Sequence, residues 1–130
     1  MLLASSSPRR KALLSRLGIP FSAQGYEADE TIEPGTAPDV AVRDLAVRKL
    51  RHVPERDRWD YILTADTVVC SPLDGRILGK PVDPKEAEGF LQILSGRQHR
   101  VLTGVCLYSR QRGTYSVEHA ETAVEVSPLS

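Results

Sequence analysis

The stretch that decides the fold is YILTADTVVCSPLDGRILGKP, residues 61–81. Its first half, Tyr61–Cys70, is almost entirely apolar or β-branched, which predicts a buried strand. One carboxylate, Asp66, interrupts this strand. A buried carboxylate must be paired, bound to a metal or protonated, because desolvating it alone costs several kcal/mol. A functional role for Asp66 is therefore favoured, although Asp66 could instead close the strand by accepting a hydrogen bond from a neighbouring turn.

The second half of the stretch predicts a hairpin that returns toward Asp66. Asp74-Gly75 is the best short-range signal for a hairpin turn, so we expect Cys70 and Ile77 to flank this turn. Lys80 follows between a glycine and a proline, which places a cation on a rigid turn. The hairpin is therefore expected to carry Lys80 back to the pocket that Asp66 faces.

Length and charge narrow the possible classes of protein. A chain of 130 residues predicts a single domain, spanning residues 1–130, that can bury a core without disulfides. The 17 basic and 17 acidic side chains cancel, whereas a general nucleic-acid binder or a membrane-surface protein would more often be basic. An anionic ligand must then be held by a local cluster of cations. Cys70 and Cys106 lie in apolar segments and are expected to be reduced core thiols.

The sequence contains no transmembrane-like stretch, and its N-terminus lacks the pattern of a signal peptide. A cytoplasmic enzyme or binding module is therefore expected, with no membrane or nucleic-acid partner.

The N-terminal segment predicts a helix that starts at a phosphate-binding site. Ser7 is a good N-cap, Pro8 suits the first helical position, and Gly18 ends the helix. Arg9 and Arg10 do not fit this pattern, because the helix macrodipole disfavours cations in the first turn. Both are explained if an anion binds at this helix end, although they could simply be solvated. The apolar face of this helix is expected to consist of Ala12, Leu13, Leu14 and Leu17.

A second predicted helix covers residues 40–53. It is preceded by a candidate short strand, residues 19–26, and an acidic loop. In the loop, Asp29 or Glu30 could supply a carboxylate to a metal, but such loops are more often just polar. Lys49 lies at the edge of the helix's apolar face. It could extend into solvent or project into a pocket at the sheet edge. The residues expected to face the core are Val42, Leu45, Ala46, Leu50 and Val53.

The last third predicts a capped helix followed by two strands. Asp83 is the expected N-cap, Glu86 completes a capping box, and the apolar stripe that follows should pack on the sheet. Residues 101–109 and 114–126 are predicted strands, joined by a turn at residues 112–113. The histidines lack the spacing of metal ligands. The fold class is therefore α/β, with a mixed twisted sheet and flanking helices.

Taken together, these motifs resemble those of the Maf family and follow the family's order along nearly the whole chain. The segments that carry the resemblance are LASSSPRR (residues 3–10), DET (29–31), LA with Lys49 (45–49), ADTVV (65–69), LGKP (78–81), LSGR with His99 (94–99) and LTGV (102–105). Family members continue past an SPLS segment like that of residues 127–130, so we expect the chain to lack the family's C-terminal portion.

The resemblance implies a nucleoside triphosphate pyrophosphatase with an elongated α/β fold related to inosine triphosphate pyrophosphatases. It implies Asp66 as the proton acceptor and a divalent metal (Mg²⁺, Mn²⁺ or Co²⁺) placed by Glu30 and Asp66, and it favours a homodimer. Residues implied to hold the triphosphate are Ser5, Arg9, Arg10, Glu30, Lys49 and Lys80. Ala-Asp-Thr at the central motif is similar to the branch that acts on dTTP and UTP, so Thr67 and Arg9 are the expected specificity residues.

This implied activity agrees with the residue chemistry. Hydrolysis of a phosphoanhydride needs stabilisation of negative charge more than covalent catalysis, and clustered cations with a metal provide it. A carboxylate is a weak base at neutral pH, so Asp66 is expected to act beside a metal that acidifies the attacking water. The alternative is a non-catalytic module that uses the same cations to bind nucleotide, linked to arrest of cell division.

Overall fold

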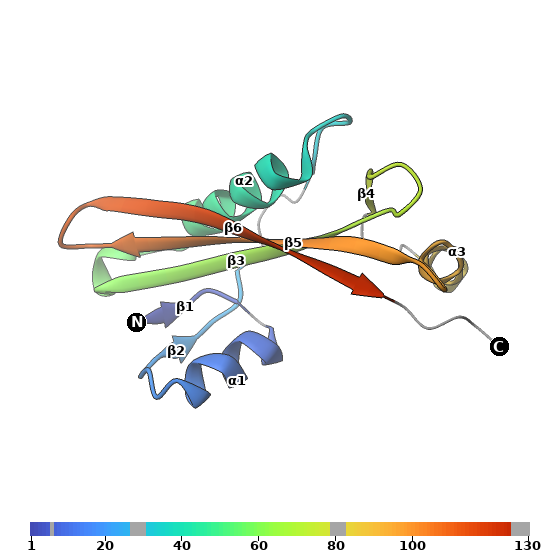
Figure 1. Ribbon diagram of the computed structural model, residues 1–130. Helices are drawn as coiled ribbons and strands as arrows, with labels where there is room; N and C mark the ends of the chain where they lie inside the picture. Colours follow the sequence, from blue (N-terminus) through green and yellow to red (C-terminus); the bar gives the residue numbers. More distant parts are fainter. Residues whose placement is uncertain (6, 27–30, 79–82, 126–130) are drawn as a thin grey trace.

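The computed structural model describes residues 1–5, 7–26, 31–78 and 83–125 and contains one mixed sheet with helices on both of its faces. In the sheet the strands follow the order β2-β1-β3-β5-β6, and β4 pairs with β3 (Figure 1). The elements are β1 (Leu2–Leu3), α1 (Pro8–Arg16), β2 (Ser22–Ala23), α2 (Pro38–Arg51), the 3₁₀ turn η1 (Arg56–Arg58), β3 (Tyr61–Cys70), β4 (Ile77–Leu78), α3 (Pro84–Leu94), β5 (Gln98–Ser109) and β6 (Thr114–Glu125). The predicted α/β class is confirmed.

Strand β3 occupies the residues predicted for it and pairs differently along its two edges. One edge pairs antiparallel with β5 over the whole strand, from Tyr61–Ser109 to Cys70–Arg100. The other edge pairs with β1 at residues 62–63 and with β4 at residues 69–70. On this second edge, and within the described part of the chain, no strand lies beside the backbone between these two pairings. This open edge includes Asp66.

The hairpin after β3 is confirmed in its register. Cys70 pairs with Ile77, as expected from the turn signal between them. Gly75 has a φ of 76°, a left-handed conformation that glycine adopts without the steric cost of a Cβ. The Asp74 Oδ1 accepts a hydrogen bond of 3.0 Å from the Arg76 backbone N–H, which closes the turn locally. Short-range chemistry therefore sets this part of the fold.

Helix α2 covers the face of the sheet opposite to α1 (Figure 1). All five side chains predicted to face the core are at most 3% exposed: Val42, Leu45, Ala46, Leu50 and Val53. Thr64 of β3 is also fully buried, and its Oγ1 donates a hydrogen bond of 2.7 Å to the Ala46 carbonyl oxygen. This bond joins the central strand to the backbone of α2.

Replacement of Thr64 by valine is expected to lower the free energy of unfolding by about 1 kcal/mol, the usual net contribution of one hydrogen bond. Valine keeps the volume of the side chain but cannot donate to the Ala46 carbonyl. Urea denaturation measures the change. Thr114→Val, on the exposed strand β6, is the matched control and should change stability little. Equal stability of the two variants would contradict a role for the buried bond.

Two helices pack less than the sequence predicts. Helix α1 begins after Ser7, as expected, but of its predicted apolar face Leu14 is buried while Leu13 and Leu17 are 57% and 63% exposed. In the described structure α1 lies beside the two-residue strands β1 and β2, which offer it a narrow surface (Figure 1). Strand β2 is shorter than the prediction because its partner β1 has only two residues.

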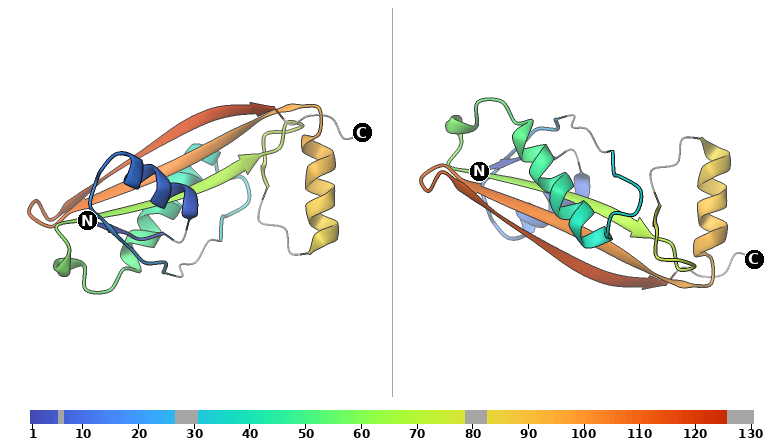
Figure 2. Two further views of the ribbon diagram at one scale, coloured as in Figure 1. Left: turned by 90° about the horizontal axis from the view of Figure 1, so that it is seen from below. Right: turned by 90° about the horizontal axis from the view of Figure 1, so that it is seen from above.

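Contrary to the prediction, helix α3 does not pack on the sheet. Its cap is confirmed, since Asp83 Oδ1 accepts a 2.7 Å hydrogen bond from the Glu86 N–H, but none of its residues is buried. Figure 2 shows α3 beyond the end of β3 and β5 rather than over a face. The apolar stripe identified a helix without revealing where that helix lies. None of the helices in the described residues has the length and hydrophobicity of a membrane span.

Candidate functional site

Asp66 lies on the open edge of β3, and its two carboxylate oxygens differ in their contacts. Oδ1 accepts a hydrogen bond of 2.8 Å from the Thr67 backbone N–H. Oδ2 is buried and accepts no hydrogen bond from the described residues. The side chain as a whole is 13% exposed. The strand-closing alternative therefore accounts for one oxygen only.

Lys49 projects from α2 onto this carboxylate rather than into solvent. Its Nζ lies 3.5 Å from Asp66 Oδ2 and donates a hydrogen bond of 3.2 Å to the Ala65 carbonyl oxygen. The Lys49 side chain is 19% exposed. Lys49 therefore lies against the open edge of β3, and its role at a pocket stays a prediction. A cation is thus held beside the acid by a helix that packs on the opposite side of the core from α1.

Arg10 reaches the same edge from the first turn of α1. Its Nη1 donates a hydrogen bond to Ser5 Oγ, and its Nη2 donates one to Thr67 Oγ1. Each bond is 3.2 Å long. Burial lowers the pKa of the Arg10 guanidinium and the Asp66 carboxylate raises it in part, but a guanidinium stays protonated at neutral pH. We call Ser5, Arg10, Lys49, Asp66 and Thr67 the acid–cation cluster.

The remaining predicted site residues are not part of this cluster. Arg9 is exposed and makes no hydrogen bond or ion pair with the described residues. Glu30 and Lys80 lie outside the described residues, so their predicted roles stay predictions. The described residues contain no group of three His, Cys, Asp or Glu side chains suited to a metal. Asp66 Oδ2 nevertheless fits one ligand position, because Mg²⁺-like ions use one or two carboxylates together with phosphate and water oxygens.

The cluster has unused hydrogen-bonding capacity that suits an anion. Ser5 Oγ accepts from both Arg10 and the Ser7 backbone N–H, which leaves its hydroxyl hydrogen able to donate. Arg10 retains further N–H groups beyond the two that bind hydroxyls. Lys49 lies beside the Asp66 carboxylate and Arg10 binds the adjacent Thr67, so an anion with several oxygens can be held close to a potential base.

Two neighbouring residues were not identified from the sequence. Thr103 Oγ1 lies 3.0 Å from Thr67 Oγ1, across the β3–β5 pair. Gly104 lies directly opposite Asp66, and a Cβ built on it would lie 2.1 Å from the Val42 carbonyl oxygen of α2. A glycine inside a strand pattern can indicate such a close backbone approach, so the sequence could have indicated Gly104. The threonine pair required knowledge of the strand register.

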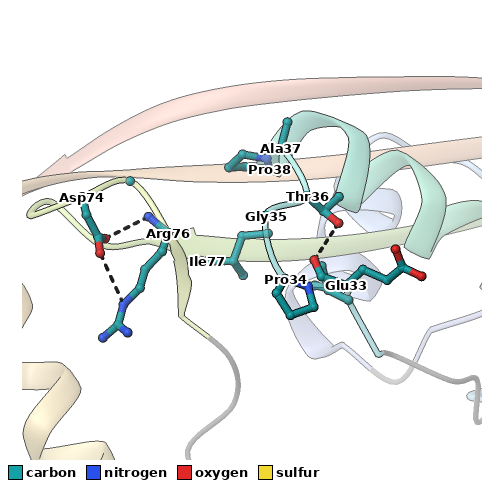
Figure 3. Close-up of a pocket in the computed structure, with 11 residues that line it drawn as sticks. Glu33, Pro34, Gly35, Thr36, Ala37, Pro38, Asp74, Arg76 and Ile77 are labelled. Atoms are coloured by element: carbon teal, nitrogen blue, oxygen red, sulfur yellow. Dashed lines mark hydrogen bonds and ion pairs between the residues drawn. The ribbon is translucent and has the colours of Figure 1, made fainter.

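A separate groove of about 680 Å³ lies between the loop before α2 and the hairpin after β3 (Figure 3). Residues 32–38 and 74–77 line it, so it includes no member of the acid–cation cluster. Its charged groups are partly neutralised, since Arg76 Nε lies 3.8 Å from Asp74 Oδ2. We assign no catalytic step to this groove.

The family model described as "Maf-like protein" matches residues 1–130. The chain belongs to the Maf family. Three curated relatives, each named dTTP/UTP pyrophosphatase, align with the whole chain: those of Symbiobacterium thermophilum at 48% identity, Salinibacter ruber at 45% and Moorella thermoacetica at 46%. The chain spans 65%, 63% and 66% of the length of these Maf relatives, respectively.

Proposed function

We propose that this Maf protein is a nucleoside triphosphate pyrophosphatase that hydrolyses dTTP and UTP to the nucleoside monophosphate and pyrophosphate. The observation that carries the proposal is that Lys49 lies 3.5 Å from Asp66 Oδ2 while Arg10, from a separate helix, binds the adjacent Thr67. The name of the relatives, dTTP/UTP pyrophosphatase, supports this choice of substrate.

The cations of the cluster suit the binding of a triphosphate. Cleavage between the α- and β-phosphates spreads negative charge over phosphoryl oxygens, and fixed cations stabilise that charge without having to reorganise. Arg10 can donate several N–H groups in a planar fork, whereas Lys49 supplies a compact charge next to the acid. We propose that Ser5, Arg9 and Lys80 also bind the triphosphate.

Asp66 is proposed as the group that takes the proton from the attacking water. Its Oδ2 is buried and accepts no hydrogen bond from the described residues, so a water molecule or a metal ion could bind there. A divalent cation (Mg²⁺, Mn²⁺ or Co²⁺), held by Asp66 and Glu30, would supply an acidified water and neutralise phosphate charge. Lys49, with its Nζ 3.5 Å from Oδ2, places a positive charge beside this carboxylate.

Specificity is assigned to Thr67 and Arg9. Thr67 lies inside the cluster, hydrogen-bonded to Arg10, whereas Arg9 is exposed at the start of α1. Thr67 follows the acid in β3 and Arg9 precedes Arg10 in α1, so both lie next to members of the cluster, where contacts to the sugar or base are proposed. A cytoplasmic location, a homodimer and the absence of a nucleic-acid partner stay predictions.

A panel of nucleoside triphosphates, assayed for pyrophosphate release with Mg²⁺ or Mn²⁺, tests the proposal. We expect turnover to be highest with dTTP and UTP and to fall to background after chelation with EDTA, because the phosphate charge is then uncompensated. Restoring the metal should restore turnover. Nucleotide binding without metal-dependent turnover would instead support the non-catalytic binding module.

A further inference from the structure

We propose that Thr103 is a positioning residue of this site, which fixes the Thr67 hydroxyl and, through it, the Arg10 guanidinium. The inference rests on the proposed function and extends it to a residue that touches neither the acid nor the predicted phosphate donors. Thr103 lies on β5, whereas Thr67 lies on β3, and the two are direct partners in the sheet.

The register of β3 and β5 brings the two hydroxyls together. Directly opposed residues of an antiparallel pair send their side chains to the same face, where threonine pairs commonly hydrogen-bond. The Oγ1 atoms of Thr67 and Thr103 lie 3.0 Å apart, within hydrogen-bonding distance. Thr103 is half-buried and Thr67 is exposed, so the pair lies at the solvent-facing side of the site.

The directions of the hydrogen bonds show how Thr103 can restrict the Thr67 hydroxyl. A guanidinium only donates, so Thr67 Oγ1 must be the acceptor of the Arg10 bond. The Thr67–Thr103 contact then occupies either the hydroxyl hydrogen of Thr67 or its other lone pair. A hydroxyl with partners on both sides cannot rotate freely. The rotamer of Thr67, and the place where Arg10 can bind it, are thereby fixed.

Arg10 is consequently held at two points. Nη2 binds Thr67 on the central strand, and Nη1 binds Ser5, itself held by the Ser7 backbone N–H. Two fixed contacts orient the plane of the guanidinium, and with it the N–H groups that remain for a phosphate. Loss of the Thr103 hydroxyl would leave only the Ser5 contact fully fixed. Pre-organisation of the cation, rather than its charge, is what Thr103 would supply.

Thr103→Val removes the hydroxyl at constant volume and tests the inference. We expect KM for dTTP to rise about fivefold to tenfold, the size of one net hydrogen bond, while kcat changes less than twofold. Thr103→Ser keeps the hydroxyl and should stay within twofold of the wild type. Thr122→Val, on the exposed part of β6, is the control for threonine-to-valine exchange in the sheet and should leave KM unchanged. Thr103→Ala is a second hydroxyl-free variant, should the valine variant not fold.

A double-mutant cycle separates positioning from a merely structural role. If Thr103 acts through Thr67, the variant carrying both Thr67→Val and Thr103→Val should show the KM of Thr67→Val alone. Additive effects, an unchanged KM in Thr103→Val, or failure of Thr103→Ser to restore it would each overturn the inference.

Titration of dTTP by calorimetry gives the same comparison as a dissociation constant and needs no turnover. Binding by a wild type that releases no pyrophosphate would contradict the proposed function while still testing Thr103. A wild type that neither binds nor hydrolyses dTTP or UTP would overturn both.

Discussion

Replacing Asp66 by asparagine is expected to reduce pyrophosphate release from dTTP by about 10³-fold, within the range usual for loss of a general base. Asparagine has the same shape, and its side-chain oxygen can still accept from the Thr67 N–H, as Oδ1 does now. It cannot take a proton from water, and it removes the negative charge beside Lys49. Nucleotide binding should persist, because the cations that hold the phosphates remain.

Parallel measurements of kcat and of dTTP affinity, by a pyrophosphate assay and by calorimetry, check this expectation. Asp74→Asn is the matched control, since Asp74 is an exposed hairpin residue outside the acid–cation cluster. The control should turn over dTTP at the wild-type rate. Wild-type turnover by Asp66→Asn would exclude Asp66 as the base, whereas loss of binding in that variant would assign Asp66 to substrate or metal retention.

The central strand and its hairpin could be predicted because their signals are local. A β-branched apolar run determines β3, and Asp74-Gly75 determines the turn that pairs Cys70 with Ile77. The N-terminal ends of α1 and α3 were likewise predictable from neighbouring residues. Asp83 caps α3, whereas Ser7 makes no side-chain cap hydrogen bond and the local signal at α1 is Pro8 at the first helical position. The site residues Asp66 and Arg10 were identified as exceptions to such local patterns, a buried charge and a cation at the wrong helix end.

Long-range features could not be predicted in the same way. The apolar stripe of α3 has the period of a packed helix, yet nothing in it specifies which surface it meets, and none of its residues is buried. Whether Lys49 faced solvent or the pocket depended on how α2 crosses β3. The Thr67–Thr103 pair depended on the exact β3–β5 register. Each of these is a property of the tertiary arrangement rather than of the segment.

That arrangement depends on Gly104, and Gly104→Ala is expected to lower the free energy of unfolding by about 3 kcal/mol. Gly104 is buried in β5, and an added Cβ would lie 2.1 Å from the Val42 carbonyl oxygen and 2.9 Å from the Arg43 nitrogen. Both are backbone atoms of α2, which cannot rotate away as a side chain could. The helix must shift, and overpacking of this kind typically costs 1–3 kcal/mol, occasionally more.

Gly89→Ala is the control with the opposite expected sign. Gly89 lies in helix α3 with no atom within 4 Å of its would-be Cβ, so alanine there should stabilise the protein by about 0.5–1 kcal/mol. Urea denaturation of both variants measures the two changes. Replacing glycine by alanine usually raises the free energy of unfolding, and this effect applies at both sites. Only the contact with α2 can therefore make the change at Gly104 destabilising. Equal or increased stability of Gly104→Ala would contradict the close approach of α2 to the sheet.

The same substitution connects packing to the site. Gly104 lies opposite Asp66, and Lys49 lies about two helical turns beyond Val42 on the helix that would have to move. A shift of α2 away from β5 should therefore lengthen the 3.5 Å approach of Lys49 Nζ to Asp66 Oδ2. In any Gly104→Ala protein that still folds, we expect kcat for dTTP to fall about tenfold or more, since small displacements of positioned groups are costly in catalysis. A folded variant with unchanged kcat would mean that Lys49 does not need this helix position to serve the acid.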